Sequence, residues 1–179
     1  LSAVNSINWA RIMIQIAYYA HAALSLGAPD RKVSFAVPTG NFGNVLAAWA
    51  ARRIGLPIAR LVIGSNRNDI LTRFFTTGTM DIQGVHPTLS PSMDIQVSSN
   101  LERLLFEMSG RDGAALAEMM LRFRSEGEVS VAPEQLAWLS ERFAAGRFDD
   151  DECLSLIGER FRRDGDDAAD EHERGGADA

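Results

Sequence analysis

Apolar and polar positions alternate with two different spacings along the chain, and together these spacings predict a fold of both helices and strands. Apolar residues at helical spacing predict a first helix, which Ser6 or Asn8 would cap and which Gly27 would end. Two short apolar runs with β-branched residues predict buried strands at Val33–Val37 and Ile58–Ile63. The N-terminal half therefore alternates helix with strand.

The two predicted strands are joined by a glycine-containing loop and a helix at residues 44–53, which Gly55 would end. Strand, loop, helix and strand within such a short stretch form one βαβ unit. A βαβ unit implies a parallel sheet with a right-handed crossover. The predicted fold class is therefore α/β, with a parallel-sheet βαβ core.

The C-terminal half shows helical spacing only. A short helix at residues 68–76 would end at Gly78, and residues 79–98 read as irregular. Ser99 and Glu102 have the spacing of a capping box for the next helix. Further helices are predicted at about 112–125, 133–145 and 150–162. We expect an α/β part over residues 1–98, a helical section of the same domain over 99–163, and a disordered acidic tail over 164–179.

Charge and composition exclude several functional classes. The net charge of −6 resides in residues 164–179, and the rest of the chain balances 17 acidic with 17 basic residues. No basic face for nucleic acid is expected, and no apolar run approaches the ~18 residues of a membrane helix. A single cysteine, Cys153, rules out an internal disulfide and favours a reducing, cytoplasmic setting. The sequence shows no group of residues with the types and spacing of metal ligands.

The most informative motif is the loop PTGNFGN, which lies between the first strand and the following helix. Its two glycines can take positive φ and let the backbone approach a ligand closely. The helix beyond it offers unpaired N–H groups and the positive end of its dipole, and side-chain donors lie within the loop. The motif therefore predicts an anion cradle, most naturally for a phosphate, at Thr39, Gly40, Asn41, Phe42, Gly43 and Asn44.

Two familiar nucleotide motifs are absent, and a plain tight connection remains an alternative for this loop. No GxxxxGK[ST] occurs, so a triphosphate loop is excluded. No GxGxxG occurs, and Ile63–Asn66 stands where a dinucleotide site needs an acidic residue. A single phosphate monoester, such as that of pyridoxal phosphate, suits the loop better.

Four segments together resemble threonine synthase of the bacterial and fungal branch: NSINWARIMIQIAYY, PTGNFGN, GLPIARLVIGSNRNDILTRFFTTG and LSPSMDIQVSSNLERLLFE. The similarity runs through roughly residues 1–155. It implies the tryptophan-synthase-β-like fold, fold type II of the pyridoxal-phosphate enzymes. It also implies a cytoplasmic carbon–oxygen lyase of threonine biosynthesis, which converts the small molecule O-phospho-L-homoserine and water to L-threonine and phosphate.

The resemblance also implies roles for particular residues. It places the cofactor phosphate on the loop from Thr39 to Asn44, and it makes residues 1–98 a partial pyridoxal-phosphate-binding domain. It assigns Ser6, Arg11 and Asn44 to the phosphate of the substrate. A helix N-terminus and a guanidinium suit that task. The alternative for Arg11 is an ordinary solvated helix arginine.

The family's Schiff-base lysine has no counterpart in this sequence, so no catalytic residue is assigned. The only lysine, Lys32, precedes the first strand, at the end opposite the loop. After about Leu156 the resemblance stops. We therefore expect a fragment, produced by truncation, a frame shift or a chimeric gene, that is inactive by itself.

Two other interpretations stay open at this point. The chain could come from another fold type II enzyme, a serine/threonine dehydratase or a cysteine synthase, or it could be a non-catalytic remnant. Ser6 and Arg11 discriminate the first of these, because those enzymes handle no substrate phosphate. His86 is expected to be a loop histidine, and Asp94 and Asn100 are expected to cap or order loops.

Overall fold

Three parallel strands in the order β1-β2-β5 carry the fold: β1 Val33–Pro38, β2 Ile58–Ser65 and β5 Phe143–Arg147. The computed structural model describes residues 7–155, and β1 to β5 all lie in the unit that ends at Arg147. β2 is the central strand and pairs with both neighbours. The predicted parallel pairing of the first two strands is confirmed.

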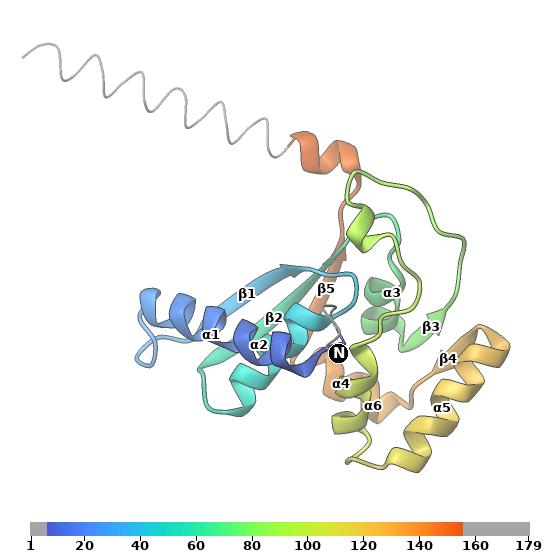
Figure 1. Cartoon of the computed structure of the whole chain (residues 1–179), viewed down its shortest axis with the longest axis horizontal. Helices are drawn as coiled ribbons and strands as arrows, with labels where there is room; N and C mark the ends of the chain where they lie inside the picture. Colours follow the sequence, from blue (N-terminus) through green and yellow to red (C-terminus); the bar gives the residue numbers. More distant parts are fainter. Residues whose placement is uncertain (1–6, 156–179) are drawn as a thin grey trace, which may run out of the picture. The chain divides into compact units, whose positions relative to one another are not determined.

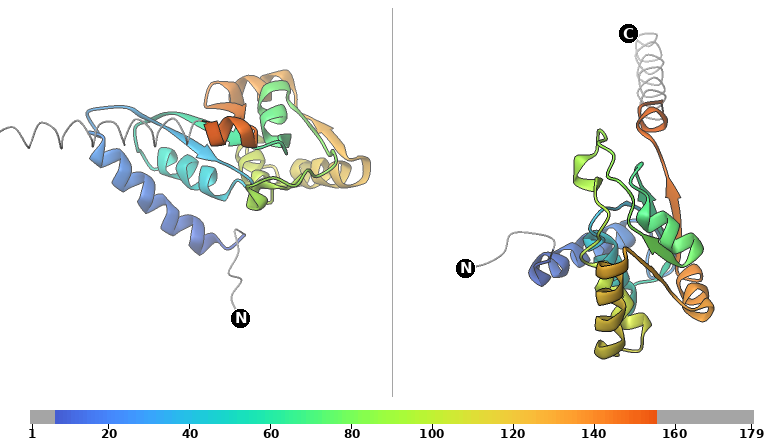
Figure 2. Two further views of the ribbon diagram at one scale, coloured as in Figure 1. Left: turned by 90° about the horizontal axis from the view of Figure 1, so that it is seen from above. Right: turned by 90° about the vertical axis from the view of Figure 1, so that its right-hand side faces the viewer.

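One face of this sheet is buried and carries the helices, whereas the other face is exposed along β1. α1 (Trp9–Ser25) and α2 (Gly43–Arg53) lie side by side on the buried face (Figure 2). α3 (Ile70–Thr77) and α6 (Pro133–Ser140) complete it, because Phe75 of α3 contacts Phe143 of β5 and Trp138 of α6 contacts Trp49 of α2. α1 begins as predicted at Asn8, whose side chain accepts a hydrogen bond of 3.0 Å from the backbone N–H of Ala10. It ends just before Gly27, which takes a φ of 97°.

An aromatic cluster fills the space between the sheet and the start of α2. The ring of Phe42 stacks on that of Phe75 with centroids 5.8 Å apart, and Phe75 contacts Phe143 at 5.1 Å. Trp49 of α2 approaches Phe143 at 5.7 Å. Phe42 and Phe143 are 1% and 2% exposed. The loop before α2 is thus anchored in the core by its own aromatic side chain.

The predicted helix over residues 133–145 is wrong in its second half. α6 ends at Ser140, and Phe143–Arg147 form the strand β5. Leu139 and Phe143 lie at helical spacing, which suggested a continuous helix. In the structure the open edge of β2 takes up this segment, and Phe143 is the register partner of Leu61. Tertiary pairing therefore overrides the local pattern.

A second, two-stranded sheet was not expected. β3 (Thr79–Asp81) pairs antiparallel with β4 (Glu128–Ser130), which follows α5 (Gly113–Glu126). β3 begins directly after Gly78, which ends α3 with a φ of 81°, as predicted. The C-terminal section is helical as expected, but it also carries β4 and β5.

Residues 82–98, which we call the strap, connect β3 to α4 (Leu101–Met108) and are drawn as the long green loop in Figure 1. Their one regular element is a single 3-10 turn, η1 (Pro91–Met93). The predicted capping box of α4 does not form, because the N-cap is Asn100, whose side chain makes no capping bond. Ser99 instead donates to the side chain of Asn41 at 3.4 Å.

The described part of the second unit is a short stretch, residues 148–155. Residues 150–155 are helical, and Asp149 and Glu152 cap this helix through reciprocal backbone-to-carboxylate bonds of 2.9 and 2.8 Å. The rest of the helix predicted to 162 and the acidic tail at 164–179 lie outside the described residues. Among residues 7–155, no helix combines the length and apolar composition needed to span a bilayer.

Candidate functional site

A polar cavity of about 180 Å³ lies where β1 ends and α2 begins. All the residues of the predicted cradle, Thr39 to Asn44, line it. Arg11 and Gln15 reach it from α1, and Ser92 reaches it from the strap. In open parallel sheets, ligands bind beyond the carboxyl ends of the strands, and this cavity has that position.

Unused backbone donors are the main chemical feature of the loop. Thr39 N–H donates to the carbonyl of Gly64 at 2.8 Å, and Leu46 N–H donates to the carbonyl of Phe42 at 2.9 Å. Between these two, the N–H groups of residues 40–45 donate to no acceptor within the described chain. They stand at the positive end of the dipole of α2. This arrangement favours a bound anion.

The left-handed residue of the loop is Phe42, with a φ of 61°, and not one of the glycines. Gly40 and Gly43, which could take positive φ, do not do so. A non-glycine residue in this region of φ is strained, and it stays there only where the surrounding packing holds it. The buried ring of Phe42 supplies that packing against Phe75 and Phe143. The aromatic cluster therefore fixes the direction in which the following N–H groups point.

Gly40 is required for a different reason, which is the close approach of the strap. A Cβ on Gly40 would lie 2.8 Å from the carbonyl oxygen of Ser92 and 3.1 Å from Cα of Met93. Both neighbours are backbone atoms, which cannot move aside as a flexible side chain can. The strap thus closes one wall of the cavity through a contact that admits only hydrogen at this position.

Replacing Gly40 by alanine is expected to lower the free energy of unfolding by about 1–3 kcal/mol, because the strap must shift to admit the methyl group. It should also enlarge the cavity and weaken phosphate binding. Urea unfolding measures the first effect. Gly84→Ala is the matched control, since a Cβ on this strap glycine meets nothing within 4 Å. Equal stability of the two variants would show that the strap is free to move.

Hydrogen bonds from the strap and α4 hold the loop from outside. Ser98 donates its hydroxyl to the carbonyl of Gly40 at 3.0 Å. Asn100, which is 1% exposed, donates from both its backbone and its side chain to the carbonyl of Asn41, at 3.2 and 3.0 Å. The expected loop-ordering role of Asn100 is confirmed, and its target is the cradle itself.

Asp94 orders the strap in the same way. Its carboxylate accepts bonds from both the backbone and the hydroxyl of Thr88, at 2.9 and 2.7 Å, and from the side-chain amides of Asn66 and Asn68, at 2.7 and 2.9 Å. Burial of Asp94 works to raise the pKa of this carboxyl, but these hydrogen bonds outweigh it and the pKa lies below its ordinary value. The Asp94 carboxylate therefore connects the residues that follow β2 to the strap through hydrogen bonds.

His86 is an exposed loop residue, as expected. Its backbone, rather than its imidazole, takes part in the strap. Its N–H donates to the side chain of Asn68 at 2.8 Å, and its carbonyl accepts from the same side chain at 2.8 Å. No chemical role follows for the imidazole.

The predicted substrate-phosphate residues are partly brought together. Arg11 and Asn44 line the same cavity, whereas Ser6 lies outside the described residues. The hydroxyl of Thr39, expected to be a donor for the ligand, instead donates to the carbonyl of Val37 at 2.6 Å. The loop can therefore donate to a ligand from its backbone N–H groups and its asparagine side chains, but not from the Thr39 hydroxyl, whose hydrogen is already used.

Two lining residues with polar side chains were missed from the sequence. Gln15 lies four positions after Arg11 on α1, and this helical spacing could have pointed to it. Ser92 contributes from an irregular segment, and no local pattern marks it. Lys32 is exposed before β1, at the other end of the strand from the cavity.

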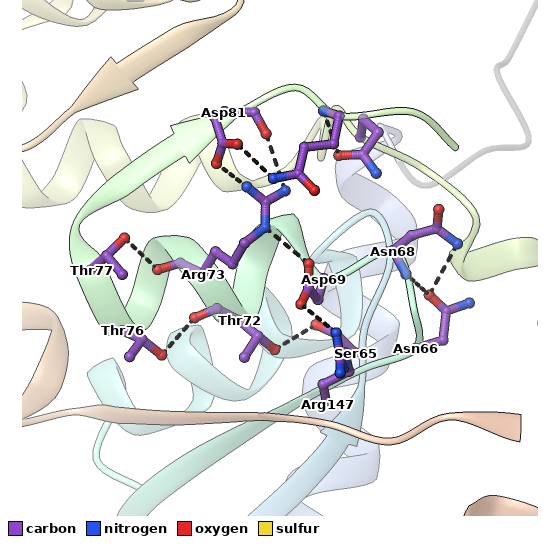
Figure 3. A network of polar contacts seen from close by, with 12 residues as sticks. Ser65, Asn66, Asn68, Asp69, Thr72, Arg73, Thr76, Thr77, Asp81 and Arg147 are labelled. Carbon is purple, nitrogen blue, oxygen red and sulfur yellow. Dashed lines mark hydrogen bonds and ion pairs between the residues drawn. The ribbon is translucent and has the colours of Figure 1, made fainter. Parts of the chain in front are cut away.

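A separate network of charges lies at the carboxyl ends of β2 and β5 and ties α3 to them (Figure 3). Asp69 accepts from Arg73 at 2.9 Å and from Arg147 at 3.3 Å, and Arg73 also pairs with Asp81. Thr72 hydrogen bonds to the hydroxyl of Ser65 at 2.9 Å. The charges satisfy one another, so this network is structural. No cluster of metal ligands occurs within the described part of the chain.

Comparison with known proteins identifies close relatives. The chain is 51% identical over 166 residues to threonine synthase of Pseudomonas aeruginosa, which covers 93% of the chain and 35% of that protein. It is 43% identical over 188 residues to threonine synthase of Schizosaccharomyces pombe, with 92% and 36% covered. No protein-family model matches the chain.

Solved structures agree with these relatives. The crystal structure of pyridoxal-phosphate-bound threonine synthase from Brucella melitensis matches with a TM-score of 0.89 at 53% identity, over 92% of this chain and 36% of that one. The α/β fold of the type II enzymes, expected from the sequence, is thereby confirmed. The chain spans about a third of the length of the curated relatives that it matches.

Proposed function

The chain is a homologue of threonine synthase over about a third of that enzyme's length, and from this premise we propose that it forms the phosphate-binding part of a threonine synthase active site. The observation that carries the proposal is the row of unused N–H groups of residues 40–45, with Arg11 on the same cavity. Backbone donors suit the phosphate of pyridoxal phosphate, and the guanidinium suits a second phosphate.

The donor set fits the cofactor in three respects. The N–H groups bind phosphate oxygens without needing a lysine, and the strap keeps solvent from one side. Among the described residues that line the cavity, none carries a carboxylate that would repel an anion. When bound, pyridoxal phosphate would supply an electron sink that stabilises carbanions of an amino-acid substrate. The loop from Thr39 to Asn44 would hold it through its phosphate.

The proposed reaction converts O-phospho-L-homoserine and water to L-threonine and phosphate. In it Arg11 and Asn44 would hold the substrate phosphate as donors and keep the departing phosphate oriented. Ser6 is proposed as a third contact. The chain would therefore bind and orient two phosphate groups, and the residue that moves protons would have to come from elsewhere. We propose a cytoplasmic setting and a small-molecule substrate, with no nucleic acid and no membrane partner.

The other fold type II activities are less well supported. A serine/threonine dehydratase or a cysteine synthase has no substrate phosphate to bind, whereas Arg11 lines the cavity beside the cradle. Threonine synthase of Corynebacterium glutamicum is a further relative, at 43% identity over 154 residues. A guanidinium at this place is what distinguishes a site for two phosphates from a site for one.

Arg11→Ala tests the proposal directly. Loss of a charge-assisted contact is expected to weaken binding of O-phospho-L-homoserine by about 10-fold or more, while binding of pyridoxal phosphate to the backbone cradle changes less. Isothermal titration of the purified chain with each ligand separates the two effects. Arg122→Ala, on the exposed side of α5, is the control. Equal affinities for the substrate in both variants would remove Arg11 from the site.

A further inference from the structure

A buried hydroxyl connects α1 to the start of α2 at the edge of the cavity. Tyr19, which is 7% exposed, donates its hydroxyl hydrogen to Oδ1 of Asn44. Asn44 is the second residue of α2 and itself lines the cavity. The bond thus joins a residue in the core of α1 to a polar side chain that faces the ligand space.

This bond determines which end of the Asn44 amide faces the cavity. Because Oδ1 is held by Tyr19, Nδ2 is the end left for a ligand, and no acceptor among residues 7–155 takes a hydrogen bond from it. If the amide were turned over, Nδ2 would face the tyrosyl oxygen, Oδ1 would face the ligand, and the tyrosyl hydrogen would lose the acceptor that it has here. Burial raises the pKa of Tyr19 to about 12, so this hydrogen is present at neutral pH.

The orientation matters chemically because the two ends of the amide are opposite in character. Nδ2 carries two N–H donors, which match phosphate oxygens, and Oδ1 is an acceptor, which repels them. We infer that Tyr19 is a positioning residue for the phosphate site: its hydroxyl holds Asn44 with the amide nitrogen toward the ligand and so favours anions. This inference rests on the proposed function and deepens it.

The packing of Tyr19 allows its hydroxyl to be tested without disturbing its ring. The ring meets that of Phe35 edge to face, with centroids 4.9 Å apart. Tyr19→Phe keeps this contact and removes only the oxygen. Tyr18→Phe makes the identical change on the neighbouring residue, which is 61% exposed, and serves as the matched control.

The first measurement is the affinity of the purified 179-residue chain for inorganic phosphate and for pyridoxal phosphate by isothermal titration. Tyr19→Phe is expected to weaken binding about 3- to 10-fold, and Tyr18→Phe to leave it unchanged. Asn44→Ala should weaken binding as well, and Tyr19→Phe should then add no further loss. Additive losses, or an unchanged affinity in Tyr19→Phe, would overturn the inference.

The second measurement needs no ligand. The side-chain NH₂ signals of Asn44 in an ¹⁵N-labelled chain are expected to shift in Tyr19→Phe and to stay in place in Tyr18→Phe. Failure of the wild-type chain to bind either phosphate would sink the proposed function. Unshifted Asn44 signals in Tyr19→Phe would sink the positioning role, whether or not phosphate binds.

Discussion

The 179-residue chain alone is expected to release no phosphate from O-phospho-L-homoserine above the rate that pyridoxal phosphate gives free in solution. The reaction needs an amine beside the cofactor's aldehyde, to bind it and to move protons. The chain's only lysine is exposed before Val33, while the cradle follows Pro38. A strand of this length separates the two by about 20 Å, which a lysine side chain does not span.

The assay compares this chain, its Lys32→Ala variant and the full-length threonine synthase of Pseudomonas aeruginosa, with colorimetric detection of phosphate. Only the full-length enzyme should turn over. Turnover by the chain that disappears in Lys32→Ala would show that Lys32 reaches the cofactor after all. Turnover that survives this substitution would defeat the argument from the missing lysine.

Phe42→Ala is expected to lower the free energy of unfolding by about 3–5 kcal/mol, a large share of the stability of an ordinary domain. The ring is 1% exposed and contacts both Phe75 and Phe143. Its removal leaves a cavity between the sheet and α2. The alanine that remains would still have to adopt a φ near 61°, now without the packing that holds it there.

Urea unfolding followed by circular dichroism gives this difference. Phe148→Ala serves as the control, because its ring is 49% exposed, and it should change the stability by less than about 1 kcal/mol. A small loss in both variants would mean that the aromatic cluster is loosely packed. Phosphate binding should fall together with stability in Phe42→Ala, since the same ring directs the N–H groups of the loop.

The βαβ core could be predicted from the sequence because local and tertiary signals agree there. Val33–Val37 and Ile58–Ile63 are apolar runs bounded by loop residues, and the structure extends them only to Pro38 and Ser65. The loop between them is marked by its glycines and by the helix that follows. Its place at the edge of the sheet then follows from parallel pairing alone.

β5 could not be predicted, because its sequence has no strand pattern of its own. Phe143–Arg147 reads FAAGR, and its alanines favour a helix. Only the open edge of β2, far away in the sequence, makes this segment a strand. The same limit applies to Ser92, whose backbone lies against Gly40 through a contact between distant segments.

The sequence does not indicate which residue of the loop takes the left-handed conformation. Glycine tolerates positive φ best, so Gly40 and Gly43 were the natural candidates. The structure uses Phe42 instead, since a buried aromatic ring can hold a strained backbone that an exposed side chain could not. Gly40 serves the approach of the strap. The sequence pattern identifies the loop, whereas packing determines which residue takes the left-handed φ and which one admits the strap.

The strand order β1-β2-β5 has a consequence for how the chain reaches this structure. β1, α2 and β2 are consecutive, so they can assemble soon after they leave the ribosome. β2 gains its second neighbour only when Phe143–Arg147 emerge, after α3, the strap, α4, α5 and α6 have been made. Such a high contact order slows folding. Until then an apolar strand edge is open to pairing with another nascent chain, which makes this interval the one in which aggregation competes most strongly.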